Sequence, residues 1–230
     1  MNGQKVRELG TKMNPKKDKL IVDGKLVFQP KREEIHWVML NKPRGTLTTV
    51  SDDKNRETVL KYIPKANQLR ILPVGRMDRD TSGLFLLTNE VGWIHMLTHP
   101  AFPSYQRFEV VVKGPVDRNA LILLSYGKLI DPRTNRAFPA IPVEIIEVQP
   151  GKLITLDCVL DNIPAAILFD IIPVLKCQFV SSRRTEFGPI RLKSLKRGDW
   201  RELTLKEVTL LKEFCDKKKS TKKKSSSEKK

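Results

Sequence analysis

Two aspartates lie close together in the segment GRMDRDTSGLFLLTN, residues 75–89. Asp78 and Asp80 are separated by one arginine, Arg76 precedes them, and an apolar run follows. A carboxylate that stays ionised beside an arginine can act as a nucleophile or as a general base. The same carboxylates could instead bind a divalent cation, or they could only shape a turn. The chemistry therefore depends on what surrounds the two aspartates.

A metal site is disfavoured by the residues around these carboxylates. Arginines flank both aspartates, and Gly75 and Arg76 separate Asp78 from the end of the preceding apolar segment, where a phosphate-accepting aspartate would be expected. His95 and His99 have a helical spacing, but no third ligand stands at a supporting offset. The sequence also lacks a phosphate-binding loop, a dinucleotide fingerprint and a nucleophile elbow. We therefore expect neither a metal nor a cofactor.

The charge of the chain predicts a polyanionic partner. Its 230 residues carry a formal net charge of +17, and 40% of them are hydrophobic. A globular domain of this charge is typical of proteins that bind nucleic acid. Residues 217–230 hold eight lysines and one glutamate. We expect this segment to be disordered, where it would attract phosphates without sequence preference or only keep the protein soluble.

Cysteine usage and hydropathy indicate an intracellular protein. The three cysteines, Cys158, Cys177 and Cys215, are far apart and form no paired motif. No apolar run approaches the length of a membrane span, and no secretory signal is recognisable. We expect a protein of the cytoplasm, or of an organelle, with no membrane partner.

Short strands and helices are predicted on both sides of the aspartate segment. The expected strands cover 34–45, 83–89, 106–116, 141–148 and 152–160, and the expected helices cover 56–63, 90–100, 117–127, 165–175 and 200–218. The last helix is expected to begin at Thr204, because Glu207 follows at the spacing of a capping box. Most strands are joined as hairpins, which favours an α+β fold with a largely antiparallel sheet.

Four ordered motifs connect the chain to a known family. They are VMLNKPRGTLTTVSD (38–52), LPVGRMDRDTSGLFLLTNE (72–90), LTHP (97–100) and FGPIRLKSLKRGDWRELT (187–204). Together they resemble the bacterial-type ribosomal RNA pseudouridine synthases that carry an N-terminal alpha-L RNA-binding module. The resemblance covers almost everything from Ile35 to Glu213. It implies the pseudouridine synthase fold: a mixed, mainly antiparallel central sheet with flanking helices, here with a small N-terminal β remnant of the module.

The resemblance also implies an activity and a catalytic residue. Such enzymes flip a uridine out of structured RNA, break its N-glycosidic bond, rotate the base and rejoin it to ribose through carbon. Their catalytic aspartate lies in the motif G-R-x-D, which falls on Asp78. An ionised carboxylate could attack an electron-poor uracil carbon or remove a ribose proton, and the sequence leaves both possibilities open. Neither route needs a metal or a cofactor.

Further site residues follow from the same motifs. Arg76 matches the arginine expected near the flipped nucleotide and its phosphate. Lys42 and Arg44 match the segment NKPRG and are candidates for phosphate contacts. The residues after Asp78 are expected to shape the loop through side-chain to backbone bonds and a close turn; they are Asp80, Thr81, Ser82 and Gly83.

The chain departs from the family pattern at the target pocket. Phe108 stands where the family has a tyrosine against the target uracil; the ring face is kept and the hydroxyl is lost. Residues 162–171, NIPAAILFDI, stand where the family has a basic stretch resembling EGRNRQVRRM. One of its arginines normally pairs with the catalytic aspartate, and its position falls near Phe169. Arg183 and Arg184 could substitute for it.

The N-terminal segment resembles only part of the RNA-binding module. Residues 2–27 match its β portion, with Asn2-Gly3 at the hairpin turn, whereas the two helices that usually precede that portion are not found. We expect that either the module is degenerate or the true start lies upstream. We therefore expect three parts: a partial alpha-L module (1–33), a catalytic domain (34–213) and a disordered Lys/Ser-rich tail (214–230).

Two functions remain open from the sequence. The first is an RNA pseudouridine synthase that acts on structured RNA, either ribosomal RNA or a pre-ribosomal particle, with Asp78 as its catalytic carboxylate. The second is a catalytically impaired RNA-binding or ribosome-assembly factor on the same fold. The retained Asp78 and Arg76 favour the enzyme, and the lost arginines of 162–171 favour the impaired factor.

Overall fold

The computed structural model describes residues 2–8, 11–14, 17–28, 34–99, 105–149, 151 and 153–227, the last eleven through their backbone alone. The chain divides into two compact units, Met1–Ile35 and His36–Lys230. None of the helices in the described ranges combines the length and the apolar content needed to cross a membrane.

The first unit contains the predicted N-terminal β remnant. Strands β1 (Leu20–Val22) and β2 (Lys25–Phe28) pair antiparallel. Asn2 and Gly3 both have positive φ angles, 51° and 82°, as expected for a tight turn. The Asn2 side chain donates to Asp18 and accepts from the Lys19 backbone N–H, each at 2.8 Å. These bonds tie the turn to the segment that leads into β1.

The second unit is built on one large mixed sheet. Its main strands are β3 (Trp37–Lys42), β5 (Thr81–Thr88), β6 (Tyr105–Lys113), β9 (Val143–Gln149), β10 (Leu153–Asp161), β11 (Gln178–Phe187) and β13 (Trp200–Glu202). They lie in the order β13-β3-β5-β11-β6-β10-β9. Every neighbouring pair is antiparallel except β5 with β11, which is parallel. The predicted α+β fold with a mainly antiparallel sheet is confirmed.

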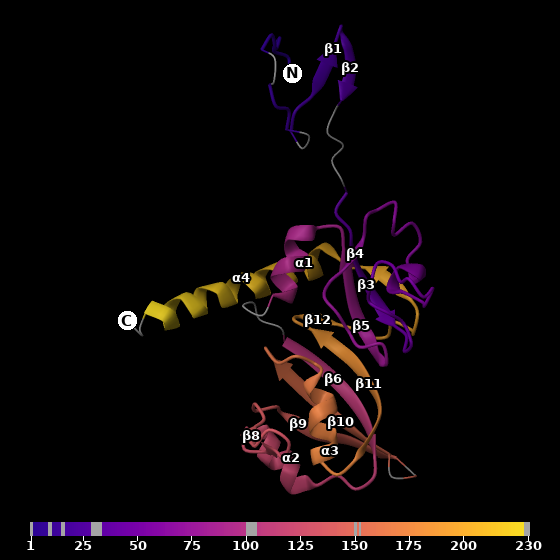
Figure 1. The fold of residues 1–230 in the computed structure, drawn as a ribbon, viewed down its shortest axis with the longest axis vertical. Helices are drawn as coiled ribbons and strands as arrows, with labels where there is room; N and C mark the ends of the chain where they lie inside the picture. The colour runs from indigo at the N-terminus through magenta and orange to yellow at the C-terminus, as the bar shows by residue number, and fades with distance from the viewer. Residues whose placement is uncertain are drawn as a thin grey trace. The chain divides into compact units, whose positions relative to one another are not determined.

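Short elements complete the sheet and cover it. Strand β4 (Leu72–Pro73) pairs with β5, β12 (Ile190–Arg191) with β11, and β7 (Ile130–Asp131) with β8 (Arg136–Ala137). The helices are η1 (Val59–Tyr62), α1 (Val91–Thr98), α2 (Arg118–Ser125), α3 (Ile167–Val174) and α4 (Leu205–Ser227). Figure 1 shows α1 and α4 beside β3, β4 and β5, and α2 and α3 beside β9, β10 and β11.

Helix α4 begins at the predicted cap and continues farther than expected. Thr204 and Glu207 form the capping box: the Thr204 backbone N–H donates to the Glu207 carboxylate at 2.9 Å, and the Glu207 N–H donates to the Thr204 hydroxyl at 3.2 Å. The backbone is helical to Ser227, whereas the predicted helix ended at residue 218 and the Lys/Ser-rich tail was expected to be disordered. Lysine is a good helix former, and a helix extends readily from a turn that is already packed.

Strand β11 is an element that the sequence predictions did not include. Its middle, residues 181–186, is polar and charged, so it shows no apolar alternation. The segment is extended because β5 and β6 pair with it on its two sides. Its conformation is therefore decided by its neighbours in the sheet rather than by its own composition.

Three apolar clusters stabilise the sheet. Strands β3 and β5 are buried on both faces, with Met39, Leu84 and Leu86 in one cluster and Leu40, Phe85 and Leu87 in another. The third cluster packs β6 and β10 against α2 and α3. Two lobes result, and β11 joins them by pairing with β5 of the first lobe and β6 of the second.

The junction between β5 and β11 requires a glycine. Gly83 has a φ of 103°, and a Cβ atom on it would collide with the carbonyl oxygen of Arg184 and lie 2.7 Å from the Arg184 amide nitrogen. No larger residue fits without moving a strand, because both of these neighbours are backbone atoms. The close-turn role expected of Gly83 is thus a close approach between two strands.

The Gly83 contact predicts a large loss of stability on substitution. We expect Gly83→Ala to lower the free energy of unfolding by about 4 kcal/mol, because the new methyl group meets backbone and the φ angle is unfavourable for alanine. Gly92→Ala is the matched control, since a Cβ there meets nothing within 4 Å, and it should change stability by less than about 1 kcal/mol. Urea unfolding measures both; similar values for the two variants would contradict the interpretation.

Candidate active site

Three of the predicted site residues share one face of the sheet. Lys42 pairs with Gly83, Gly83 with Arg184, and Arg184 with Phe108, so one row of partners crosses β3, β5, β11 and β6. Directly opposed residues of neighbouring strands point to the same side of a sheet. The row therefore places the side chains of Lys42, Phe108 and Arg184, which come from three separate parts of the sequence, on the same face.

The loop between β4 and β5 carries the proposed catalytic aspartate. Asp78 is exposed, and its Oδ1 accepts a hydrogen bond from the Asp80 backbone N–H at 2.7 Å. Its carbonyl oxygen accepts from the Thr81 N–H at 3.2 Å. The loop is thus shaped by the Asp78 side chain, whereas we expected the Asp80 side chain to shape it; Asp80 contributes its backbone amide.

The residues after this loop anchor it to β11. The hydroxyl groups of Thr81 and Ser182 lie 2.7 Å apart, and the Ser82 hydroxyl donates to the Ser182 carbonyl at 3.2 Å. All three side chains are buried. The shaping roles expected of Thr81 and Ser82 correspond to these bonds, which link the loop to the strand that carries Arg184.

Lys42 binds the backbone of the loop that carries Asp78, and its ammonium group is not accessible to a phosphate. Its side chain is fully buried, and its Nζ donates to the carbonyl oxygens of Pro43, Thr46 and Arg79 at 3.1, 2.9 and 3.2 Å. The prediction that Lys42 contacts RNA phosphates is therefore wrong in this structure. Burial lowers the pKa of Lys42 to about 8, while the negative charges of Asp78 and Asp80 act in the opposite direction.

Asp78 lines a cavity of about 400 Å³. Its walls are mostly apolar and come from the loop that carries Asp78, from β5, β6 and β11, and from the start of α3. The lining residues are Arg76, Met77, Asp78, Thr81, Phe108, Ala165, Ala166, Leu168, Phe169 and Arg184. The structure therefore brings together Asp78, Arg76, Phe108 and Arg184, which were predicted from separate parts of the sequence.

Arg184 is a buried cation at the base of this cavity. It is 4% exposed, and burial lowers its pKa to about 9. Its Nε donates to the Leu84 carbonyl at 2.8 Å and its Nη1 donates to Gln106 Oε1 at 2.9 Å. The guanidinium carbon also lies 5.0 Å from the centre of the Phe187 ring. Within the described residues no carboxylate lies within 4 Å of Arg184, Asp78 included.

Two other predicted arginines lie outside the cavity. Arg183 follows the strand alternation to the opposite face of β11, where its Nη1 lies 3.6 Å from Glu109. It therefore cannot replace the missing family arginine, and that hypothesis is wrong for Arg183. Arg44 is exposed beside Gly45, whose N–H donates to the Arg79 carbonyl at 2.8 Å; the predicted phosphate contact of Arg44 stays a prediction.

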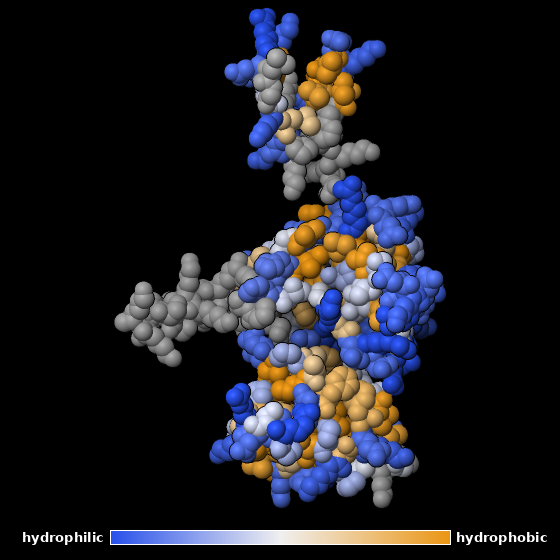
Figure 2. All heavy atoms as spheres, viewed as in Figure 1, coloured by the Kyte–Doolittle hydropathy of each residue, from blue (hydrophilic) through white to orange (hydrophobic). Residues whose placement is uncertain are grey.

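An aromatic ring lies near the position where the resemblance implied an arginine. Phe169 lines the cavity, is 37% exposed, and packs against Phe179 with the ring centroids 4.9 Å apart. The space-filling view shows apolar side chains gathered where α3 lies, with polar residues around them (Figure 2). An apolar wall thus replaces the basic stretch that the resemblance implied.

Gln106 is a site residue that sequence reasoning missed. It is buried and holds the Arg184 guanidinium from the neighbouring strand β6. Residues 106, 108, 110 and 112 of β6 are all buried and alternate with more exposed residues. This alternation could have placed Gln106 beside Phe108, but a lone glutamine in a strand carries no motif that points to chemistry.

The chain is similar to known proteins over nearly all of its length. Residues 36–121 match a family described as RNA pseudouridylate synthase. The chain is 32% identical to ribosomal large subunit pseudouridine synthase B of Bacillus subtilis, with 94% of this chain and 86% of that protein covered. It is 33% identical to an uncharacterized RNA pseudouridine synthase of Aquifex aeolicus, with 92% and 82% covered.

A solved structure agrees with these relatives at the level of the fold. A crystal structure of a pseudouridylate synthase superposes with a TM-score of 0.63 at 24% identity, covering 91% of this chain and 86% of the other. The fold of this chain is thus shared with a pseudouridylate synthase. The chain belongs to the RNA pseudouridine synthase family.

The lowered pKa of Lys42 predicts a pH-dependent contribution to stability. Its folded-state pKa of about 8 lies below the ordinary value of 10.5. Between these values the unfolded chain binds a proton that the folded chain does not, so the contribution of Lys42 to the free energy of unfolding rises with pH. From about pH 8 to pH 10, the wild type should gain up to about 1.4 kcal/mol per pH unit relative to Lys42→Met in urea unfolding. A constant difference would contradict the lowered pKa.

Proposed function

We propose that this pseudouridine synthase modifies a uridine of ribosomal RNA and that Asp78 is its catalytic carboxylate. The observation that carries the proposal is the single cavity lined by Asp78, Phe108 and Arg184. Its size lies within the range of ligand pockets, and its walls are apolar with a few polar groups, as such pockets are. A uridine that leaves the RNA stack would find a ring, a carboxylate and a cation in one place.

The chemistry follows from the place of each group. Phe108 lines the cavity while it is only 1% exposed, so the flipped uracil would lie against the part of the wall that Phe108 backs. Asp78 lies on an exposed loop over the cavity, where it would either form a bond to the uracil ring or remove a proton from the ribose. In both cases the bond from ribose to nitrogen breaks, the base rotates, and a bond from ribose to carbon forms, so no atom is gained or lost.

Arg184 is the proposed cation of the site. It has no carboxylate within ion-pair distance among the described residues, so its charge is available to oxygen atoms of the substrate. Because Arg184 and Asp78 do not form an ion pair, we propose that Arg184 acts on the RNA rather than on Asp78. It would supply the positive charge that Phe169 cannot.

The choice of ribosomal RNA rests on charge and on the relatives. The net charge of +17 favours a polyanion, and the Bacillus subtilis relative is named for the large ribosomal subunit. We propose a uridine of large-subunit RNA, free or in a pre-ribosomal particle, as the target, and the cytoplasm as the place of the reaction.

The replacement at Phe169 favours a second candidate function. An enzyme that has lost the arginine beside its aspartate could bind RNA without isomerising uridine, as a ribosome-assembly factor would. The two candidates predict different outcomes for the same experiment, which is pseudouridine mapping on transcribed large-subunit RNA incubated with the purified protein.

The two aspartates should respond differently to substitution. Asp78→Asn keeps an oxygen that can accept the Asp80 N–H and removes only the charge, so the protein should fold and lose pseudouridine formation by at least about a thousandfold. Asp80→Asn should retain activity within about tenfold, because the Asp80 side chain does not line the cavity. Both are assayed by pseudouridine mapping and checked by thermal unfolding.

The outcome separates the candidate functions. Equal loss of activity in two folded variants would contradict the assignment of Asp78. If the wild type binds the RNA but forms no pseudouridine, the impaired-factor function replaces the proposed one.

Arg184 and Arg183 provide a second matched pair. Arg184→Lys keeps a charge but loses the planar donors, and we expect about a tenfold rise in KM for RNA with the fold intact. Arg183→Lys lies on the opposite face of the same strand and should leave KM unchanged. A fully active Arg184→Lys protein, or one that only loses stability, would assign Arg184 to the fold rather than to the site.

A further inference from the structure

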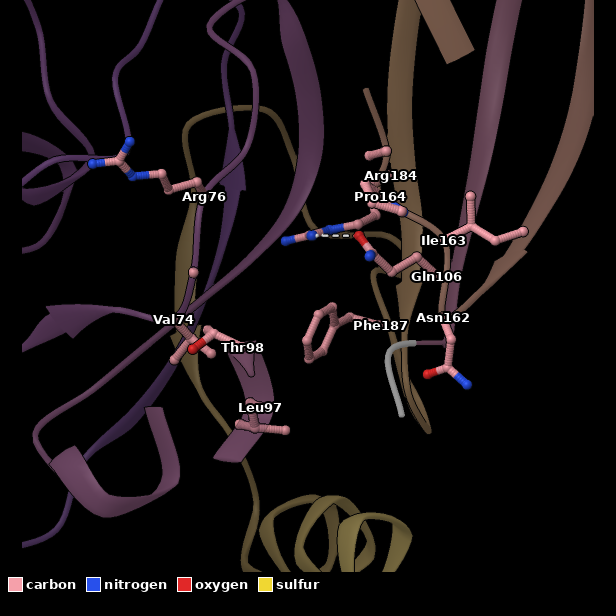
Figure 3. A pocket seen from close by; sticks show the side chains of 12 residues that line it. Val74, Arg76, Leu97, Thr98, Gln106, Asn162, Ile163, Pro164, Arg184 and Phe187 are labelled. Atoms are coloured by element: carbon pink, nitrogen blue, oxygen red, sulfur yellow. Dashed lines mark hydrogen bonds between the residues drawn. The ribbon is translucent and has the colours of Figure 1, made fainter. Parts of the chain in front are cut away.

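A second cavity of about 300 Å³ adjoins the first. It lies between α1 on one side and β6, β11 and residues 162–165 on the other (Figure 3). The two cavities share Arg76, Ala165 and Arg184 in their walls. The residues that line only the second include Val74, Leu97, Thr98, Gln106 and Phe187.

The buried polar groups of this second cavity are hydrogen-bond donors. Gln106 Oε1 already accepts from Arg184 Nη1 at 2.9 Å (Figure 3), so the Gln106 amide has its N–H groups to offer. Arg184 has only N–H groups, and Figure 3 shows its guanidinium directed toward the space that the lining residues enclose. Gln106 and Arg184 are 8% and 4% exposed, so their geometry is set by the sheet.

The remaining walls suit a flat ring. Val74, Leu97 and Phe187 are buried apolar residues, and the Phe187 ring extends into the space in Figure 3. A phosphate would meet these apolar walls with a single guanidinium opposite, because Figure 3 shows the Arg76 guanidinium directed away from the cavity. A nucleobase would satisfy both the apolar walls and the donors.

We propose that this second cavity binds the base of a nucleotide next to the target uridine, and that it favours guanine. The inference rests on the proposed function, since the first cavity is taken as the uridine site. Neighbouring bases of a single-stranded loop can be splayed apart and bound separately. Guanine presents two acceptors, O6 and N7, on one edge, whereas adenine presents an acceptor and a donor there. A pair of donors therefore distinguishes the two purines.

The experiment combines a substitution that fills the second cavity with RNAs that lack the base expected to bind there. Two synthetic RNA hairpins contain the mapped uridine. One has an abasic nucleotide directly before the uridine, and the other has it directly after. For one adjacent position, the abasic RNA should raise KM by about tenfold with the wild type. Thr98→Phe, which fills only the second cavity, should raise KM for the intact RNA by a similar factor. It should also abolish the effect of the abasic change.

Thr209→Phe is the matched control. Thr98 and Thr209 are both exposed helical threonines whose hydroxyl groups donate to the carbonyl four residues earlier, at 2.8 and 2.9 Å. Only Thr98 lines the cavity, so Thr209→Phe should behave as the wild type. The proposal would be overturned if the abasic change raised KM by the same factor in the Thr98→Phe protein as in the wild type.

The base preference is tested on the same hairpin. With guanine, KM should be at least about tenfold lower than with adenine at the sensitive position, and Gln106→Leu should reduce this ratio to below about threefold. Equal KM values for the two purines in the wild type would overturn the preference for guanine.

Failure of this inference differs from failure of the proposed function. If no abasic change affects KM while Asp78-dependent pseudouridine forms, the second site is wrong and the function stands. If no pseudouridine forms on any RNA, the proposed function fails. The same variants are then compared by fluorescence anisotropy on labelled large-subunit RNA fragments, where equal affinities of the Thr98→Phe and Thr209→Phe proteins would overturn the second site as well.

Discussion

The close approach of Gly83 to the backbone of Arg184 is the constraint on which the site depends. It is the place where the parallel pair β5 and β11 joins two lobes that are otherwise packed around separate cores. The same residue pairs with Lys42 on its other side. Three strands therefore meet around one position that has no side chain, and the loop that carries Asp78 ends just before it, where β5 begins at Thr81.

Two cations are buried around this junction for different reasons. Lys42 donates to three backbone carbonyls and links the segment after β3, at Pro43 and Thr46, to the loop that carries Asp78, at Arg79. Arg184 is held by a carbonyl, an amide and an aromatic ring. Burial lowers the pKa of each. Lys42 thus stabilises the loop, while Arg184 carries charge to the walls of two cavities. Because the wall around Phe169 is apolar, the buried positive charge at this cavity comes from Arg184.

Local sequence signals predicted much of the framework. The apolar runs of β3 and β5, the alternation of β6 and the capping box of α4 were all recognisable, because each depends on residues close together in the chain. The motif around Asp78 identified the family. Strand β11 was not recognisable, since its polar middle becomes extended only between two partners that are distant in sequence. The Asp78 carboxylate was predicted as the reactive group, but its own bond to the Asp80 amide was not.

By itself, the sequence determined the fold class, the family and the candidate aspartate, since composition, periodicity and ordered motifs are properties of the chain alone. Tertiary structure decided which basic residues face the site. Lys42, Arg183 and Arg184 are all basic residues in or near a motif. In the structure, however, Lys42 is buried under a loop, Arg183 faces the opposite side of the sheet, and Arg184 lines the cavity. Strand register and burial separate them, and both arise from pairing between segments far apart in the sequence.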